Sequence, residues 1–152
     1  MLRPGDLLFT RYNGNPEFVG VAGVVRTNDE LVYPDKLIRL RLPDGSPVSS
    51  DFLEIAVNSG LARKFLRCRV RTTAGQAGIS GADLKACPVA FPPSRSQQAE
   101  VVQEVHRALT EANATAAAVA TNLRRSERLR SAILKLAFEG RLVGEEEDII
   151  HA

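Results

Sequence analysis

Cysteine, histidine and long apolar runs are scarce in this chain of 152 residues, and each shortage excludes a class of protein. The two cysteines, Cys68 and Cys87, lack the paired spacing of a zinc site or a disulfide framework, and a reducing compartment suits them best. No apolar stretch approaches the roughly 20 residues that cross a bilayer, and Met1 is not followed by a signal-peptide pattern. We therefore expect a soluble, cytoplasmic protein with no membrane partner.

Recognisable arrangements of catalytic side chains are also missing. His106 and His151 do not form a metal-binding constellation with carboxylates or cysteines, and we interpret both as surface residues. The segment from Asn15 to Phe18 is superficially similar to the Asn-Pro-Pro-Tyr or Asn-Pro-Pro-Phe motif of adenine methyltransferases. Its second proline is absent, however, and no glycine-rich cofactor loop precedes it. We expect no catalytic residue, no metal and no cofactor.

Asp and Glu are absent from residues 55–82, although the whole chain has a net charge of only +2. Five basic residues lie within nine positions of this segment: Arg63, Lys64, Arg67, Arg69 and Arg71. Near the C-terminus, an acidic run balances them in the average: Glu145, Glu146, Glu147 and Asp148. From the residues alone, the basic cluster is equally well interpreted as a phosphate-binding surface or as a solvated helix face.

Residues 1–93 predict a small mixed α+β domain. Alternation of apolar and basic residues over 37–42 indicates a half-buried strand. Ser49 is an N-cap candidate for helices that break near residues 59–60, and Ser80 is one for a short helix that ends at Lys85. The other expected elements are strands at residues 6–10, 18–25 and 88–91 and a loop at residues 72–81.

One long helix is predicted over residues 94–140, followed by an acidic tail at 141–152. Ser94 and Gln97 have the spacing of a capping box, and Gly140 is a natural stop. At about 1.5 Å per residue, the stretch from residue 95 to residue 139 is about 65 Å long. Apolar residues recur along it with the alternating spacing of a coiled coil: Val102, Val105, Leu109, Ala112, Ala116, Val119 and Leu123, with Ile133 further on.

This helix is expected to need a partner. A domain of about 93 residues has a radius of gyration near 13 Å, so half of the helix would extend beyond it, although packing on its own domain is the simpler alternative. The first half of the helix is acidic and the second half basic, the main charges being Glu100, Glu104 and Glu111, then Arg124, Arg125, Arg128, Arg130 and Lys135. An antiparallel partner of like sequence would therefore set acid against base.

Three segments resemble the specificity subunit of type I restriction-modification enzymes. Gly5-Asp6-Leu7-Leu8-Phe9-Thr10-Arg11 is similar to the "GDIL-x-TR-x-G" segment of that family's target recognition domain. Gly75-Gln76-Ala77-Gly78-Ile79-Ser80, with residues 88–97, resembles its "GQ-x-x-IS... P-x-x-x-PP-x-x-x-Q" exit into a helix. The run from Ile133 to Leu142 resembles the "ILK-x-AFEGKL" end of that helix. Ser94 and Ser96 depart from the Leu and Glu that are usual there.

The resemblance implies a partial target recognition domain over residues 1–93, followed by one arm of a helical ruler between the halves of a bipartite DNA target. It implies no catalysis, because methylation and cleavage belong to partner subunits in this family. The implied partners are double-stranded DNA, the methylation and restriction subunits, and a second specificity half or a second copy paired through antiparallel helices. The alternative is a truncated interaction protein that pairs through its helix without sequence-specific DNA binding.

The resemblance also favours DNA as the ligand of the basic cluster. Four further residues, Arg11, Asn13, Asn15 and Gln76, lie in expected loops and are of the types that read base edges, since Arg pairs with guanine and Asn or Gln with adenine. Loop polarity alone would supply the same residue types. The expected DNA-binding set therefore consists of these four residues and the five of the basic cluster.

Overall fold

The computed structural model describes residues 1–73 and 75–142, so the expected acidic run at 145–148 lies outside the described residues. One compact unit is formed by Met1–Val105, and a second unit takes in the chain from His106 onwards. The architecture is a mixed α+β part with two small antiparallel sheets, followed by one long helix, which confirms the predicted fold class.

The first sheet has the order β3-β1-β4, with β1 (Leu7–Thr10) between two antiparallel neighbours, β3 (Ala22–Val24) and β4 (Leu37–Leu40). The strands expected at 6–10 and 37–42 are confirmed. The strand expected at 18–25 is wrong in its first half, because Pro16–Phe18 forms a 3-10 helix, η1. Pro16 fixes its own φ at a helical value and Asn15 caps the turn, so pairing begins only at Ala22.

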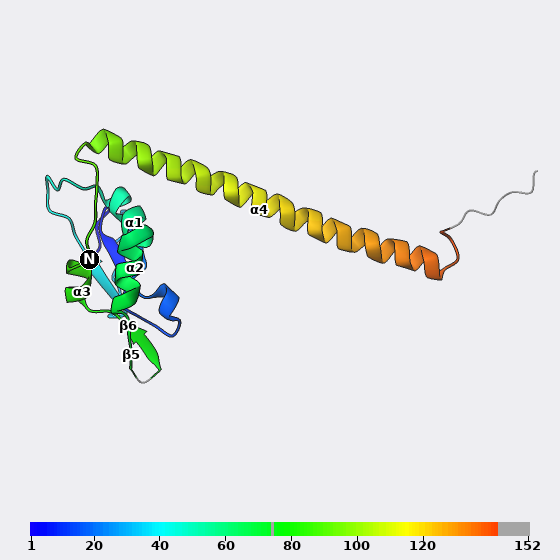
Figure 1. The fold of residues 1–152 in the computed structure, drawn as a ribbon, viewed down its shortest axis with the longest axis horizontal. Helices are drawn as coiled ribbons and strands as arrows, with labels where there is room; N and C mark the ends of the chain where they lie inside the picture. The colour runs from blue at the N-terminus through cyan, green and yellow to red at the C-terminus, as the bar shows by residue number, and fades with distance from the viewer. Residues whose placement is uncertain (74, 143–152) are drawn as a thin grey trace, which may run out of the picture. The chain divides into compact units, whose positions relative to one another are not determined.

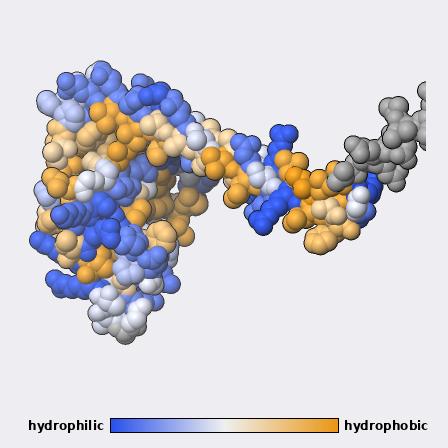
Figure 2. Space-filling model, turned by 45° about the vertical axis from the view of Figure 1, so that its right-hand side comes forward, coloured by the Kyte–Doolittle hydropathy of each residue, from blue (hydrophilic) through white to orange (hydrophobic). Residues whose placement is uncertain are grey.

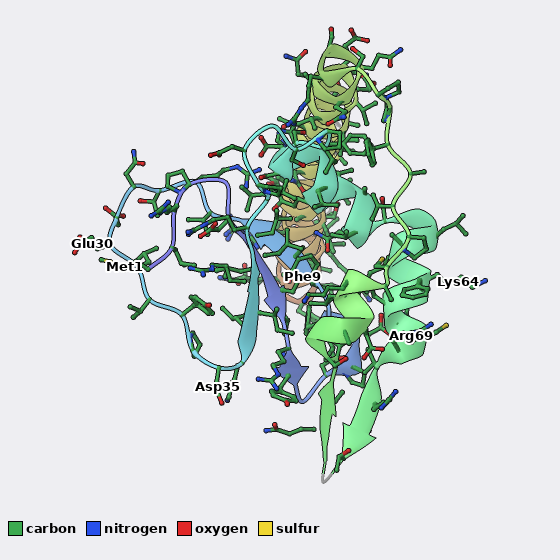
Figure 3. The ribbon with its side chains drawn as sticks, turned by 90° about the vertical axis from the view of Figure 1, so that its left-hand side faces the viewer. Met1, Phe9, Glu30, Asp35, Lys64 and Arg69 are labelled. Atoms are coloured by element: carbon green, nitrogen blue, oxygen red, sulfur yellow. The ribbon has the colours of Figure 1, made fainter. Side chains whose placement is uncertain are left out.

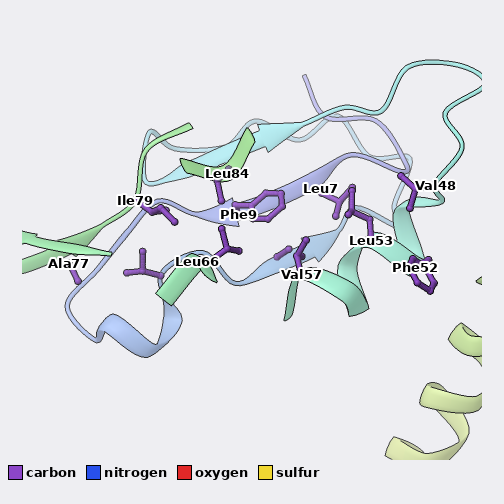
Figure 4. Packing of buried hydrophobic residues seen from close by; sticks show 12 residues of the cluster. Leu7, Phe9, Val48, Phe52, Leu53, Val57, Leu66, Ala77, Ile79 and Leu84 are labelled. Carbon is purple, nitrogen blue, oxygen red and sulfur yellow. The ribbon is translucent and has the colours of Figure 1, made fainter. Parts of the chain in front are cut away.

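Two helices lie against each other beside this sheet: α1 (Ser50–Asn58) and α2 (Gly60–Arg69) (Figure 1). The Ser49 hydroxyl accepts a hydrogen bond from the Phe52 amide, as predicted for an N-cap, and the helices break at Ser59. Figure 4 shows how Leu7 and Phe9 of β1 face the apolar side chains of the helices. Leu7 of β1 and Leu66 of α2 are fully buried in this core, so α2 is held against the sheet.

A second sheet, which the sequence did not predict, has the order β2-β6-β5. Its strands are β2 (Tyr12–Asn13), β5 (Arg71–Thr73) and β6 (Gln76–Gly78). The loop expected at 72–81 is therefore wrong for most of its length. Strands of two or three residues are too short to show an alternating pattern, and β6 is stabilised by β2, which comes from far earlier in the chain.

The segment between the second sheet and the long helix contains one helix and no strand. Ser80 and Asp83 form a capping box at the start of α3 (Gly81–Lys85), which confirms the predicted helix. The strand expected at 88–91 is wrong, because residues 87–92 have no regular secondary structure. Three prolines in and beside this segment cannot donate to a ladder: Pro88, Pro92 and Pro93.

The long helix α4 (Arg95–Phe138) is a single element of 44 residues, close to the expected span. It ends as predicted: Gly140 has φ +69°, its amide donates to the Ala137 carbonyl at 3.1 Å, and the Arg141 amide donates to the Leu136 carbonyl at 2.9 Å. Every residue from His106 to Phe138 is exposed. None of the helices within the described ranges could cross a membrane.

The start of α4 is held by Gln98, which the sequence analysis did not identify. No hydrogen bond joins the Gln97 side chain to the helix start within the described part, so the expected capping box does not form. Instead Gln98 is fully buried. Its Oε1 accepts from the Ser49 amide at 2.9 Å, and its Nε2 donates to the carbonyls of Pro47 at 2.9 Å and Pro92 at 2.8 Å.

Candidate nucleic-acid interface

Two of the segments that suggested a DNA-binding family meet in space through the second sheet. Tyr12 is paired with Gly78 and Asn13 with Ala77, and the Arg11 carbonyl accepts from the Ile79 amide at 3.0 Å. This pairing brings four predicted DNA-binding residues to one groove, which we call the arginine groove. Its lining includes Arg11, Arg69, Arg71 and Gln76, together with Tyr12, Gly78 and Asp83.

Arg11 is the residue that links the two sheets, since β1 ends at Thr10 and β2 begins at Tyr12. Its amide donates to the Lys36 carbonyl at 2.8 Å, and its carbonyl accepts from Ile79, so both backbone groups are satisfied. Its guanidinium lies over the Tyr12 ring, 4.8 Å from the centroid. The backbone and the ring together limit where this cation can point.

Arg69 and Arg71 enter the groove from the junction of α2 and β5. Figure 3 shows Arg69 and Lys64 projecting from the same helix. The Arg69 guanidinium lies 4.4 Å from the centroid of the Phe65 ring and makes a long contact of 3.5 Å with Asp83. Hydrogen bonding from the Ser80 hydroxyl, supported by Arg69 and Arg71, lowers the pKa of Asp83. The groove therefore has three arginines and one ionised carboxylate that is already engaged.

The other part of the basic cluster lies on a different surface, around residues 58–60. Arg63 donates to the Val19 carbonyl at 2.8 Å and to the Glu17 carbonyl, while Arg67 forms an ion pair with the Glu17 carboxylate. Burial, and then the neighbouring Arg67, lower the pKa of Arg63. These two arginines hold η1 against α2, whereas Lys64 is exposed. The nine predicted residues thus do not form one surface.

The side chains of Asn13 and Asn15 form hydrogen bonds within the turn that contains them. Asn13 Oδ1 accepts from the Asn15 amide at 2.8 Å, and Asn15 Oδ1 accepts from the Glu17 amide at 3.0 Å. Each acceptor therefore shapes the chain between β2 and η1. Both side chains therefore stabilise the local turn. From the sequence alone, this role could not be distinguished from a role in reading bases.

Asp6, within the "GD" segment, is a buried structural residue. It is 1% exposed, and its carboxylate accepts from Arg41 Nε and Nη2, both at 2.7 Å. It also accepts from the Arg3 amide at 2.9 Å, and the preceding Gly5 has φ +87°. The hydrogen bond from Arg41 is the largest of the influences that lower the pKa of Asp6. The sequence analysis did not identify this pair, although the Gly-Asp step marks a tight turn.

The apolar stripe of α4 is mostly exposed, although its first two residues, Val102 and Val105, are half-buried. Val102 packs against the core of the first unit. Further along, Leu109, Val119, Leu123 and Ile133 are each more than half exposed. Figure 2 shows apolar side chains beside basic ones on the C-terminal part of the helix. Gln98 precedes Val102 by four residues, so it continues the spacing of the stripe, and this was the signal that could have identified it.

No candidate metal cluster of three or more His, Cys, Asp or Glu side chains occurs in the described ranges. No family model matches the chain, and no solved structure matches it. Among curated proteins, the chain is 44% identical over 147 residues to the type I restriction enzyme EcoKI specificity subunit of Escherichia coli strain K12. It is 32% identical over 145 residues to the StySPI specificity subunit of Salmonella potsdam.

Each of these two alignments covers 95% of this chain but 31% of the relative. The EcoEI specificity subunit of Escherichia coli is 33% identical over 95 residues, which is 61% of this chain and 16% of that protein. The resemblance seen in the three sequence segments is confirmed. The chain is a homologue of type I restriction enzyme specificity subunits over about one third of their length.

Proposed function

We propose that this chain is a DNA-recognising part of a type I restriction-modification specificity subunit, without catalytic activity of its own. In this proposal it reads part of a bipartite target, and methylation and cleavage belong to the partner subunits that it docks. Homology to specificity subunits supports the family role. The arginine groove is the observation that carries the assignment of DNA to this part of the chain.

The charge of the groove supports a polyanionic ligand. Arg11, Arg69 and Arg71 line it together with a single carboxylate, Asp83, which caps α3 and lies beside Arg69. Cations that lack matching carboxylates are the usual means of binding DNA phosphates, and each contact steepens the dependence of affinity on salt. Gln76, which also lines the groove, is of a type that reads adenine.

We propose that the exposed stripe of α4 is the surface for protein partners: the methylation and restriction subunits, and either a second specificity half or a second copy of this chain. The residues from Leu109 to Ile133 would form the seam. Acidic residues in the first half of the helix and basic ones in the second favour an antiparallel pair, since opposite charges then face each other. The same exposed stripe would serve the alternative function, an interaction protein that does not bind DNA.

A salt titration of duplex DNA binding separates these two functions. We expect wild-type affinity to fall steeply with salt, and the double variant Arg69→Glu/Arg71→Glu to bind more weakly with a shallower slope. The matched control is Arg124→Glu/Arg125→Glu on α4, which changes the same charge outside the groove. Equal loss in both double variants, or equal weak binding by all three proteins, would exclude the groove as the DNA site and favour the interaction protein.

A further inference from the structure

The Tyr12 ring lies directly on the backbone of β6, in the space that a side chain at position 78 would occupy. A Cβ atom placed on Gly78 would be 2.6 Å from Tyr12 Cδ1 and 2.7 Å from Cε1. These distances are far shorter than real carbon contacts, so the ring can take this position only because residue 78 is glycine. Gly78 has no positive φ, and the close approach of the ring is therefore the specific reason for glycine here.

The Arg11 guanidinium lies over the Tyr12 ring, which is held against Gly78. The guanidinium is 4.8 Å from the centroid of the ring, and the Arg11 backbone is held at both ends by Lys36 and Ile79. This contact with the ring uses the positive charge of the guanidinium and leaves its N–H groups available for a ligand. The chain thus fixes the position of this cation before any ligand arrives.

Arg11 and Arg63 are both half-buried arginines, and they differ in what satisfies them. Arg63 donates to two backbone carbonyls. Arg11 makes no side-chain hydrogen bond to a carboxylate or carbonyl within the described residues, and it lines a groove with Arg69 and Arg71. The groove holds three guanidinium groups and one carboxylate, Asp83, which already contacts Arg69, and this excess of positive charge suits an anion with several oxygens.

We propose that Arg11 is a preorganised phosphate-binding residue for the DNA backbone, acting in the arginine groove with Arg69 and Arg71. Tyr12 and Gly78 are its positioning residues. Glycine at position 78 leaves space for the Tyr12 ring, and the ring contacts the Arg11 guanidinium and limits its position. This inference rests on the proposed function, because it takes DNA as the ligand. A guanine edge could also accept from Arg11, but three convergent arginines supply more positive charge than a neutral base edge needs.

The test uses the full chain and a mixed-sequence duplex of about 30 base pairs, titrated between about 50 and 200 mM salt. We expect Arg11→Gln to lower the slope of log K against log salt by about 0.9, the value for one phosphate contact, regardless of duplex sequence. Gly78→Ala should lower it similarly, because the ring and Arg11 are displaced. In the Arg11→Gln background, Gly78→Ala should have no further effect.

A second pair of variants covers the case in which Gly78→Ala fails to fold. Tyr12→Phe keeps the ring and should keep the wild-type slope, whereas Tyr12→Leu should lose as much as Arg11→Gln while thermal unfolding shows a folded protein. Wild-type binding with an unchanged slope in Arg11→Gln, or a sequence-dependent loss in that variant, overturns the inference and leaves the proposed function intact. Absence of salt-dependent binding by the wild-type protein overturns both.

Discussion

At the scale of single residues, Asp6 shows that a segment typical of a DNA-binding family can serve folding. Its carboxylate is almost completely buried and accepts two hydrogen bonds from Arg41 across the first sheet. Arg41 lowers the pKa of Asp6 below its ordinary value of 3.8. A lowered folded-state pKa means that the pair stabilises the fold above pH 3.8, and that this contribution is lost as the pH falls through the folded-state pKa.

We predict that Asp6→Asn lowers the free energy of unfolding by about 2 kcal/mol at neutral pH, because two charge-assisted hydrogen bonds are lost. The difference between wild type and variant should shrink as the pH falls from 3.8 towards the lowered folded-state pKa, because the carboxylate of the unfolded wild-type chain takes up a proton in this range and that of the folded chain does not. Urea unfolding at several pH values measures this. A difference that stays constant down to pH 3 would show that the charge of Asp6 does not contribute.

At the scale of elements, periodic segments were predicted and short non-local ones were not. The long helix α4 and strand β4 each repeat an apolar spacing that only one secondary structure explains. The strands of the β5–β6 hairpin have three residues each, which is too short for such a repeat. Strand β6 also pairs with β2, which lies far earlier in the chain. The strand predicted at residues 88–91 is absent, because the prolines in and beside this segment cannot donate to a ladder.

The candidate site followed the same division. The sequence analysis selected Arg11, Arg69, Arg71 and Gln76 as candidates from their residue type and charge, and these four line one groove. It could not separate them from Arg63 and Arg67, whose partners on η1 are remote in the chain. Nor could it find Tyr12 and Gly78, because their contact depends on the register of β2 with β6.

We predict that the start of α4 depends on Gln98. Gln98→Ala should lower the free energy of unfolding of the first unit by about 3 kcal/mol, since a fully buried side chain is removed and the half-buried Ser49 amide and two carbonyls lose their partner. Gln97→Ala is the matched control: that side chain is exposed, and we expect a change within about 0.5 kcal/mol. Thermal or urea unfolding compares the two. Equal destabilisation by both would contradict the role given to the hydrogen bonds of Gln98, because the control variant loses none of them.

At the scale of the whole molecule, the exposed stripe of α4 predicts concentration-dependent association. Leu109→Asp should weaken self-association in sedimentation experiments, because a charge would enter the proposed seam. Ala114→Asp adds the same charge five positions further on, away from the stripe, and should have little effect. A strict monomer that also fails to bind a methylation subunit would contradict the role proposed for this helix.

The central claim is that the arginine groove binds DNA phosphates. The salt dependence of duplex binding by the full chain, compared between the wild type and Arg69→Glu/Arg71→Glu, tests this claim most directly. The account predicts a steep linear fall of log K with log salt for the wild type, and a slope that is shallower by about 2 for the double variant, at about 0.9 per phosphate contact. Identical slopes for the two proteins would contradict it.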